Sequence, residues 1–429
     1  MYKTGGSGNW KIIDELLSSA LIPRFVKVQQ FFPHPPPVDV ALEIVTGIQK
    51  KKLPIKKGAR IAITVGSRGI SNQPLAVKTI GESLRSLGAE PFMVPAMGSH
   101  AGATAEGQAA MLRDMGFSEE KMGMPIVSSM EVVELGKTKS GLPVYIDKNA
   151  YEADGIVIIN RIKSHVSFHG AYESGLMKMI TIGLGKQRGA DFAHNLGFGS
   201  MPGNVPEIAL ESLKHGKFLL AIGLLENAFH ETSKVVVLDP SEIEAEEPKL
   251  LLEAKELCGK LHFDTIDTLI IDEIGKHISG SGFDTNVVGR YHSSFISGGP
   301  KINRVLILDI SDKSKGNGLG LGIADFSTIR ALEKFDFSQT YPNVLTSTLT
   351  GGGKVPVILA NDRQAIRACI KTSNLDNWSE SRIVRIKNTL SLTEIEVSEN
   401  MLPDLKNDSR FKIISEPYEL AFNEQGNLF

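Results

Sequence analysis

The alternation of short apolar segments with amphipathic ones most constrains the fold of this 429-residue chain. Short apolar runs predict buried strands at residues 60–65, 91–95, 155–159 and 235–238. Amphipathic segments predict helices at 75–87 and at 104–115, and Thr104 is a suitable N-cap for the second of them. Strands that alternate with helices in this way indicate an α/β fold with a mostly parallel sheet.

The same rhythm starts again near Asp264. We predict strands at 268–272, 305–309 and 355–359, and helices near 326–335 and 362–371. The stretch 241–260 is first acidic and then rich in Leu, Glu and Lys, which predicts a linking helix. We therefore expect two α/β domains, residues 1–255 and 256–429, with mostly parallel sheets and an active-site cleft between them.

Composition excludes several classes of protein. Lys and Arg number 47 against 49 Asp and Glu, so the net charge of -2 gives no electrostatic basis for binding nucleic acid. The two cysteines, Cys258 and Cys369, allow neither a disulfide scaffold nor a thiolate zinc site, and they fit a reducing compartment. The longest apolar run, 218–225, is too short to span a bilayer, and the first residues do not resemble a targeting segment. We expect a cytoplasmic protein without a nucleic-acid or membrane partner.

Two histidines directly follow predicted strands. His100 lies in the sequence Gly98-Ser99-His100, and His165 follows Ser164. Ligands of open parallel sheets bind beyond the carboxyl ends of the strands, and imidazole titrates near neutral pH, so both residues are candidates for acid–base catalysis. The alternative is that each histidine only binds the backbone of its own loop.

Lys178 and His194 form a second candidate group. Lys178 lies between Met177 and Met179, and an apolar environment lowers the pKa of a lysine so that it can act as a nucleophile or a covalent tether. The alternative is a lysine whose stem packs on a helix while its charge reaches water. No His, Cys, Asp or Glu set has zinc-site spacing, so a metal bound by His194 needs ligands from another source.

Two glycine-rich segments, residues 275–290 and 316–322, are candidate ligand loops. Residues 316–322 lack the helix spacing and the downstream acidic residue of a dinucleotide-binding fingerprint. Residues 275–290 contain Lys276, Asn286 and Arg290, which could bind a carboxylate or phosphate, and Arg suits a bidentate contact. The alternative for this second segment is a surface hairpin.

Four residues in this order resemble the catalytic set of the lactate racemase family, the nickel-pincer-dependent racemases and epimerases: His100, His165, Lys178 and His194. The resemblance also includes the Ser164–His165 pair and the aromatic-x-Ser-Gly stretch that leads through Gly175 to Lys178. It extends from about residue 61 to 324 and is strongest in 154–200.

The resemblance implies a nickel-pincer nucleotide, which is a pyridinium-3-thioamide-5-thiocarboxylic acid mononucleotide made by separate cofactor-synthesis proteins. Lys178 would bind it covalently, and His194 would complete the square-planar coordination of nickel, a geometry that suits Ni(II) with sulfur ligands. Arg68, Ser164 and Gly175 would contact the cofactor. Residues 1–255 would then be the catalytic domain, and 256–429 would close the substrate cleft.

The implied activity is that of an isomerase. His100 and His165 would act as general acid and base on a 2-hydroxy acid while hydride moves reversibly between C2 and the cofactor. Arg68, Asn286 and Arg290 would bind the substrate. Lactate racemase has Asp-His-Thr-Arg-Pro where this chain has the sequence GSRG at 66–69, so a larger or differently charged 2-hydroxy acid, such as a sugar acid, is a candidate substrate.

Two other functions remain open at this point. The altered first loop is also compatible with a non-catalytic small-molecule-binding or regulatory protein on the same scaffold. An oxidoreductase with a free nicotinamide cofactor is less favoured, because the chain lacks the glycine-rich fingerprint.

Overall fold

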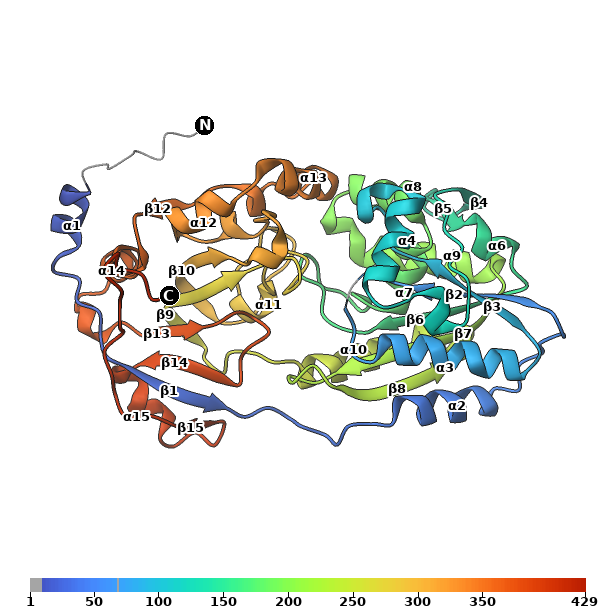
Figure 1. The fold of residues 1–429 in the computed structure, drawn as a ribbon, viewed down its shortest axis with the longest axis horizontal. Coiled ribbons are helices and arrows are strands. Elements are labelled where there is room, and N and C mark those ends of the chain that lie inside the picture. Colours follow the sequence, from blue (N-terminus) through green and yellow to red (C-terminus); the bar gives the residue numbers. More distant parts are fainter. Residues whose placement is uncertain (1–9, 68) are drawn as a thin grey trace. The chain divides into compact units, whose positions relative to one another are not determined.

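The structure, a computed structural model, describes residues 10–67 and 69–429, which form two units. One unit is Pro33–Cys258, and the other combines the residues up to Phe32 with Gly259–Phe429. We predicted one domain for residues 1–255. The structure instead groups residues 10–32 with the other unit, because β1 (Phe25–Gln30) pairs with β14 (Glu394–Ser398) and β15 (Phe411–Ile413) (Figure 1).

The unit Pro33–Cys258 is built on a five-stranded sheet with the order β3-β2-β6-β7-β8. Its strands are β2 (Arg60–Val65), β3 (Glu90–Pro95), β6 (Gly155–Arg161), β7 (Phe218–Glu226) and β8 (Thr232–Leu238). The first four strands of the order run parallel, and β8 is antiparallel to β7. The four parallel strands are almost continuously apolar and buried, as expected where helices cover both faces of a parallel sheet.

The helices of this unit are α2 (Val40–Lys50), α3 (Gln73–Ser86), α4 (Ala105–Asp114), α5 (Glu119–Met122), α6 (Lys148–Glu152), α7 (Leu176–Lys178), α8 (Lys186–Asn195), α9 (Met201–His215) and α10 (Ile243–Leu257). A hairpin of β4 (Val132–Lys137) and β5 (Pro143–Asp147) is separate from the main sheet. Thr104 caps α4 as predicted, since its side chain accepts a hydrogen bond from the Gly107 amide. Ile44 of α2 and Ile80 of α3 join Ile63 of β2 in one buried apolar cluster.

The other unit has an eight-stranded mixed sheet with the order β12-β11-β10-β9-β13-β14-β1-β15 (Figure 1). Its other strands are β9 (Thr265–Ile274), β10 (Lys301–Ile310), β11 (Phe326–Thr328), β12 (Val357–Leu359) and β13 (Ile383–Ile386). The strands from β12 to β13 are parallel, and β14, β1 and β15 continue the sheet antiparallel. Its helices are α1 (Lys11–Leu17), α11 (Thr285–Val288), α12 (Ile329–Lys334), α13 (Phe337–Ser347), α14 (Asp362–Thr372) and α15 (Leu402–Leu405).

The helix predicted at 326–335 is wrong in its first turn. Residues Phe326–Thr328 form β11, and α12 begins only at Ile329. The Ser327 hydroxyl donates to the Ile307 carbonyl at 2.7 Å, and the Thr328 hydroxyl donates to the Leu308 carbonyl at 2.8 Å. Pairing with β10 therefore satisfies polar groups that a helix would have left in the core.

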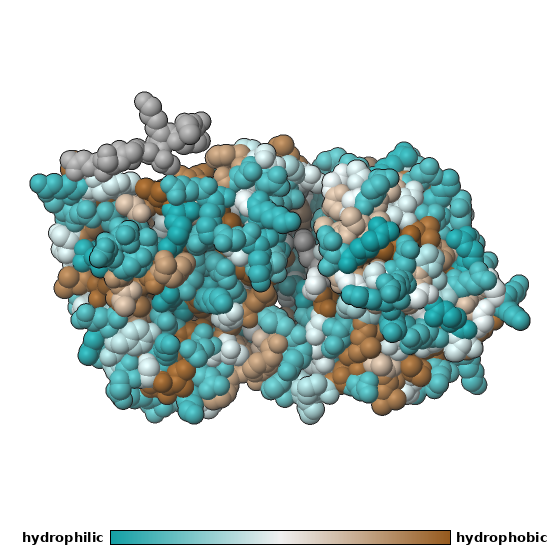
Figure 2. Space-filling model, viewed as in Figure 1, coloured by the Kyte–Doolittle hydropathy of each residue, from teal (hydrophilic) through white to brown (hydrophobic). Residues whose placement is uncertain are grey.

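The surface is mixed rather than uniformly apolar. On the face drawn in Figure 2, hydrophilic residues cover most of the surface and hydrophobic residues form small, scattered patches.

Within residues 10–67 and 69–429, none of the helices has the length and apolar character needed to cross a bilayer.

The second sheet allows a direct test of its core. Ile270 of β9 is fully buried in the cluster that Trp378 also contacts. We expect Ile270→Ala to lower the free energy of unfolding of this unit by about 2–5 kcal/mol, because the substitution leaves a cavity. Urea unfolding followed by tryptophan fluorescence measures this change. Leu345→Ala is the control, because the Leu345 side chain is 75% exposed. A change of more than about 0.5 kcal/mol in the free energy of unfolding of this control would contradict the exposure of Leu345.

Candidate functional site

The candidate site lies at the carboxyl edge of the parallel strands β2, β3 and β6. Val65, the last residue of β2, is paired with Pro95, the last residue of β3, so the loops that follow both strands leave from the same edge. The side-chain oxygen of Ser67 on the first loop is hydrogen bonded to Nδ1 of His100 on the second. Ser67 belongs to the 66–69 loop, but the sequence pattern predicted no role for it. The signal that could have predicted this contact is the position of Ser67, whose hydroxyl follows the parallel neighbour of the strand that precedes His100.

His165 follows β6 and is held by a buried carboxylate. Its backbone amide donates to Glu173 at 2.6 Å, and the Glu173 side chain is fully buried and also accepts from Lys255 of α10 at 2.7 Å. Nδ1 of His165 accepts a hydrogen bond from the Ser167 amide at 3.1 Å. A neutral imidazole that accepts at Nδ1 carries its proton on Nε2, so this contact fixes the tautomer of His165.

Lys178 is the last residue of α7, and the chain continues into a π-helical turn, Met179–Gly183. Such turns often occur at functional sites. The carboxylate of Glu247, on α10, accepts from the Met177 amide at 2.9 Å and so holds the start of α7. Gly175 makes this approach possible, since a Cβ atom there would lie 2.0 Å from Oε1 of Glu247. Gly175 therefore leaves room for the Glu247 carboxylate beside α7. Its predicted contact with the cofactor stays a prediction.

Glu247 is buried more deeply than its charge favours. Within the described residues, its Oε1 atom is buried without a hydrogen-bond partner. Burial raises the pKa of Glu247 to about 7, and the hydrogen bonds from the Met177 and Leu176 amides only partly oppose that effect. The carboxyl group that anchors the Lys178 helix is therefore partly protonated near neutral pH.

His194 lies near the end of α8 with its ring stacked on Phe198 at a centroid distance of 5.5 Å. The ring is partly exposed, but its Nδ1 atom is buried and has no hydrogen-bond partner in the part of the chain that the structure describes. Burial, followed by the positive charge of Lys178, lowers the pKa of His194 to about 4. The imidazole is therefore neutral at pH 7 and can act as a metal ligand.

Phe198 connects the candidate residues. His165 and His194 both stack on its ring, with centroid distances of 6.2 and 5.5 Å. Because the charge of Lys178 acts on His194, Lys178 also belongs to this group. The structure thus brings His165, Lys178 and His194 together, and nothing in the sequence pattern singled out Phe198.

The loop that carries His100 contacts the same elements. The Gly98 amide donates to the carbonyl of Gly183, the last residue of the π-helical turn, at 3.3 Å. A Cβ atom at Gly98 would lie 3.3 Å from the Cβ of Ala190 on α8, the helix of His194. The loop that carries His100 therefore packs on the segment between Lys178 and His194.

The donor set fits a metal-bearing cofactor better than a free metal ion. Over the described residues, no three His, Cys, Asp or Glu side chains are placed to hold a metal. One neutral imidazole with an unpartnered nitrogen beside a lysine amine supplies a single ligand and a tether. These residues fit a group that brings its own soft donors, as the nickel-pincer nucleotide does.

The other predicted site residues have different settings. Arg68 lies outside the described residues. Ser164 is partly buried between His165 and Lys163, which forms a β-bridge to Ser174. Its predicted contact with the cofactor stays a prediction.

Arg290 and Asn286 belong to the other unit. Arg290 forms an ion pair with Asp325 at 3.0 Å and donates to the Asn303 carbonyl at 2.7 Å. Asn286 donates to the Asp284 carboxylate at 3.1 Å. Both side chains thus bind their own unit in this structure, and their predicted role in substrate binding stays a prediction.

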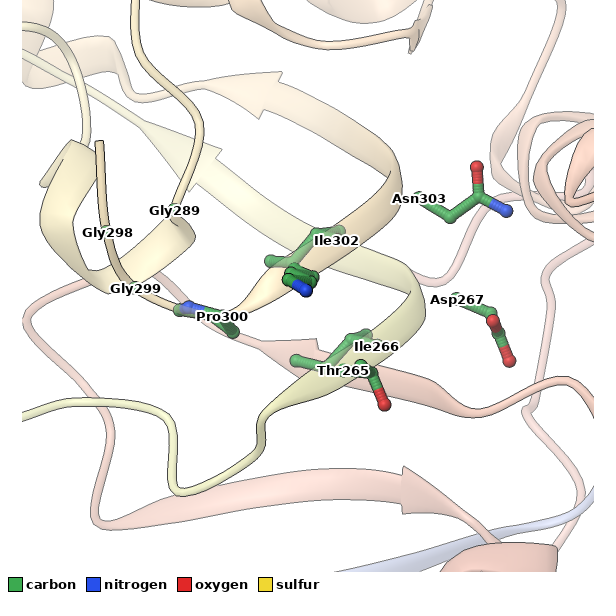
Figure 3. A pocket seen from close by; sticks show the side chains of 10 residues that line it. Thr265, Ile266, Asp267, Gly289, Gly298, Gly299, Pro300, Ile302 and Asn303 are labelled. Carbon is green, nitrogen blue, oxygen red and sulfur yellow. The ribbon is translucent and has the colours of Figure 1, made fainter. Parts of the chain in front are cut away.

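A pocket of about 630 Å³ in the same unit is a poorer candidate site. It is lined by the first residues of β9 and β10 and by Gly298 and Gly299 (Figure 3). Ligands of open parallel sheets bind beyond the carboxyl ends of the strands, and this pocket lies at the amino ends.

The pKa of Glu247 predicts a specific pH dependence of stability. A carboxyl whose pKa is raised from 4.5 in the unfolded chain to about 7 in the folded one stabilises the fold below pH 4.5, and that contribution is lost as pH rises through 7. We expect Glu247→Gln to remove this loss, which amounts to about 2.5 kcal/mol between pH 5 and pH 8. Urea unfolding followed by circular dichroism at the two pH values measures it. Glu246→Gln, on an exposed side chain of the same helix, should keep the wild-type pH dependence; equal slopes in all three proteins would contradict the burial of Glu247.

Comparison with known proteins relates part of the chain to one family. Residues 24–203 match the family model described as the lactate racemase N-terminal domain. The structure is similar to that of the lactate racemase apoprotein from Thermoanaerobacterium thermosaccharolyticum, with 14% identity, a TM-score of 0.53, and coverage of 86% of this chain and 99% of that chain. A structural-genomics protein from Thermotoga maritima matches at 12% identity and a TM-score of 0.47, over 63% of this chain and 69% of that chain. No curated protein matches the chain. Residues 24–203 therefore match a lactate racemase N-terminal domain, and the chain shares the fold of lactate racemase at low sequence identity.

Proposed function

We propose that this protein is an isomerase, a nickel-dependent racemase or epimerase of a 2-hydroxy acid. One observation carries the proposal: a neutral imidazole, His194, has a buried nitrogen without a partner and lies beside Lys178, with His165 on the same aromatic ring. Residues that could serve as a metal ligand, a tether and a proton-handling group therefore lie in one unit. The match of residues 24–203 to the lactate racemase N-terminal domain supports the same proposal.

Lys178 would hold the cofactor covalently, and His194 would bind its nickel ion. When bound, a nickel-pincer pyridinium mononucleotide would supply a reversible two-electron acceptor next to the substrate. Glu247 fixes the backbone from which the Lys178 side chain starts. His194 needs no deprotonation at neutral pH, because burial already keeps it neutral.

His165 and His100 would move the proton of the substrate hydroxyl. His165 carries its proton on Nε2, because its Nδ1 accepts from Ser167. When Ser67 accepts the Nδ1 proton of His100, Nε2 of His100 keeps a lone pair and can act as a base. One acid and one base that can exchange roles are what the interconversion of two enantiomers requires.

Arg68 is our candidate for the substrate carboxylate or the cofactor phosphate. It follows Ser67 in the sequence, and a guanidinium binds such anions in a bidentate manner. The proposed partners are a small 2-hydroxy acid and the proteins that synthesise and deliver the cofactor.

Cofactor loading is the first test. The full chain produced together with the cofactor-synthesis enzymes should carry the mass of the nucleotide on Lys178 and about one nickel ion per chain. Lys178→Met should lose the added mass, whereas His194→Ala should keep the mass and lose the nickel. Intact-protein mass spectrometry and elemental analysis measure both. An unmodified Lys178 without nickel in the wild type under these conditions would overturn the proposal.

Racemisation of a panel of chiral 2-hydroxy acids, followed by loss of optical rotation, tests the chemistry. We expect His100→Ala and His165→Ala each to lower the rate by about 10²–10⁴-fold, the usual contribution of a general acid or base, with the nucleotide mass retained. Wild-type rates in both variants would rule out their proposed roles. A loaded wild type that binds hydroxy acids without turnover would instead identify a binding or regulatory protein. Incorporation of solvent deuterium at C2 would argue against hydride transfer.

A further inference from the structure

Lys186 places a positive charge in the interior of the unit that holds the site. Its side chain is fully buried, which is rare for lysine, and its backbone has a φ of +54°, in the left-handed region that non-glycine residues seldom adopt. Its ammonium donates to the Pro95 carbonyl at 2.8 Å and to Oε1 of Gln108 at 2.6 Å, and it lies 3.6 Å from the Asp147 carboxylate. Strained backbone and buried charge are both costly, and such features concentrate at functional positions.

The acceptors of this ammonium converge on the loop of His100. Pro95 is the last residue of β3, where that loop begins. Gln108, fully buried on α4, donates from Nε2 to the Gly98 carbonyl at 2.9 Å and to the His100 carbonyl at 3.3 Å. Lys186 therefore acts on both ends of the loop, directly at Pro95 and through Gln108 at His100.

The opposite end of the network is anchored on other elements. Lys186 is the first residue of α8, which carries His194. Asp147 ends β5, and its other oxygen accepts from the Ala150 amide at 3.0 Å, so it also caps α6. Burial lowers the pKa of Lys186, and the nearby Asp147 carboxylate opposes that effect.

Stability alone does not explain this arrangement. Well-packed apolar residues commonly replace a buried ion pair without loss of stability. What an apolar side chain cannot do is bind the carbonyl and amide groups that set the path of the His100 loop.

We propose that Lys186, acting with Gln108, is a positioning residue that holds the His100 loop in fixed register with the helix that carries His194. The expected effect of the clamp on catalysis rests on the proposed function, in which His100 and His194 serve the same reaction. We call the contacts of Lys186 and Gln108 with the His100 loop the clamp. The clamp does not require the cofactor, so it can be measured in the cofactor-free chain.

Three variants separate the clamp from the buried charge. Asp147→Asn removes the negative charge and keeps both the cap on α6 and the contacts of Lys186 with the loop, so it is the control. The double variant Lys186→Met with Asp147→Asn removes those contacts and leaves no uncompensated charge. Gln108→Met breaks the connection to Gly98 and His100 and changes no charge.

The first measurement is nuclear magnetic resonance of the cofactor-free, histidine-labelled full chain. We expect the imidazole signals of His100 to shift and broaden in the double variant and in Gln108→Met, while Asp147→Asn keeps the wild-type signals. His165, on another loop, is the internal reference and should not change. Wild-type His100 signals in both test variants would overturn the clamp. Failure of both test variants to fold while Asp147→Asn folds would also overturn it, since the network would then serve the core.

The second measurement uses the loaded enzyme. A small displacement of a catalytic group typically costs about 10²-fold, so we expect kcat to fall roughly 10²-fold in both test variants with KM within about twofold of wild type. An equal loss in Asp147→Asn would assign the effect to the charge and contradict the clamp. If the wild type never carries nickel, the proposed function fails, and the resonance measurement still decides the clamp.

Discussion

The parallel pairing of β2, β3 and β6 is the constraint on which the candidate site depends. Because these strands share one direction, the loops that follow them emerge from one edge of the sheet, and they bring Ser67, His100 and His165 to that edge. An antiparallel neighbour would have sent one of these loops to the opposite edge. The chemistry proposed for the chain thus begins with backbone hydrogen bonds that involve none of the reacting side chains.

Buried ionisable groups then fix the loops that the sheet has gathered. Glu173 holds the backbone of His165, Glu247 holds the start of the Lys178 helix, and Lys186 holds the loop of His100. In each case the charged atom contacts a main-chain group, so it determines the path of the chain and not merely the position of another side chain. Each group carries a desolvation penalty, and the unit accepts three such penalties around one site.

The sequence predicted the elements whose signal is local. The strand at 60–65 and the cap at Thr104 were confirmed because apolar runs and capping side chains act within a few residues. The sequence did not predict β1, because its partners β14 and β15 are far along the chain. The sequence predicted a helix where β11 forms, because no local signal reveals the pairing of β11 with β10.

The same distinction applies to the site. The order of His165, Lys178 and His194 was readable because it resembles a family pattern, and the structure brings these three residues together. Phe198 and Lys186 were not predicted, since an aromatic ring between two histidines and an ammonium under a distant loop arise only from folding.

The position of β1 between β14 and β15 has a consequence for biosynthesis. The unit Pro33–Cys258 is continuous in sequence, so it can complete its sheet while the ribosome is still translating the rest. β1 emerges before that unit, yet both of its neighbours follow it, and until then it is a strand with unpaired edges. The part of the molecule that holds the candidate site can therefore complete its sheet first, whereas β1 is synthesised before that unit and is paired only after it.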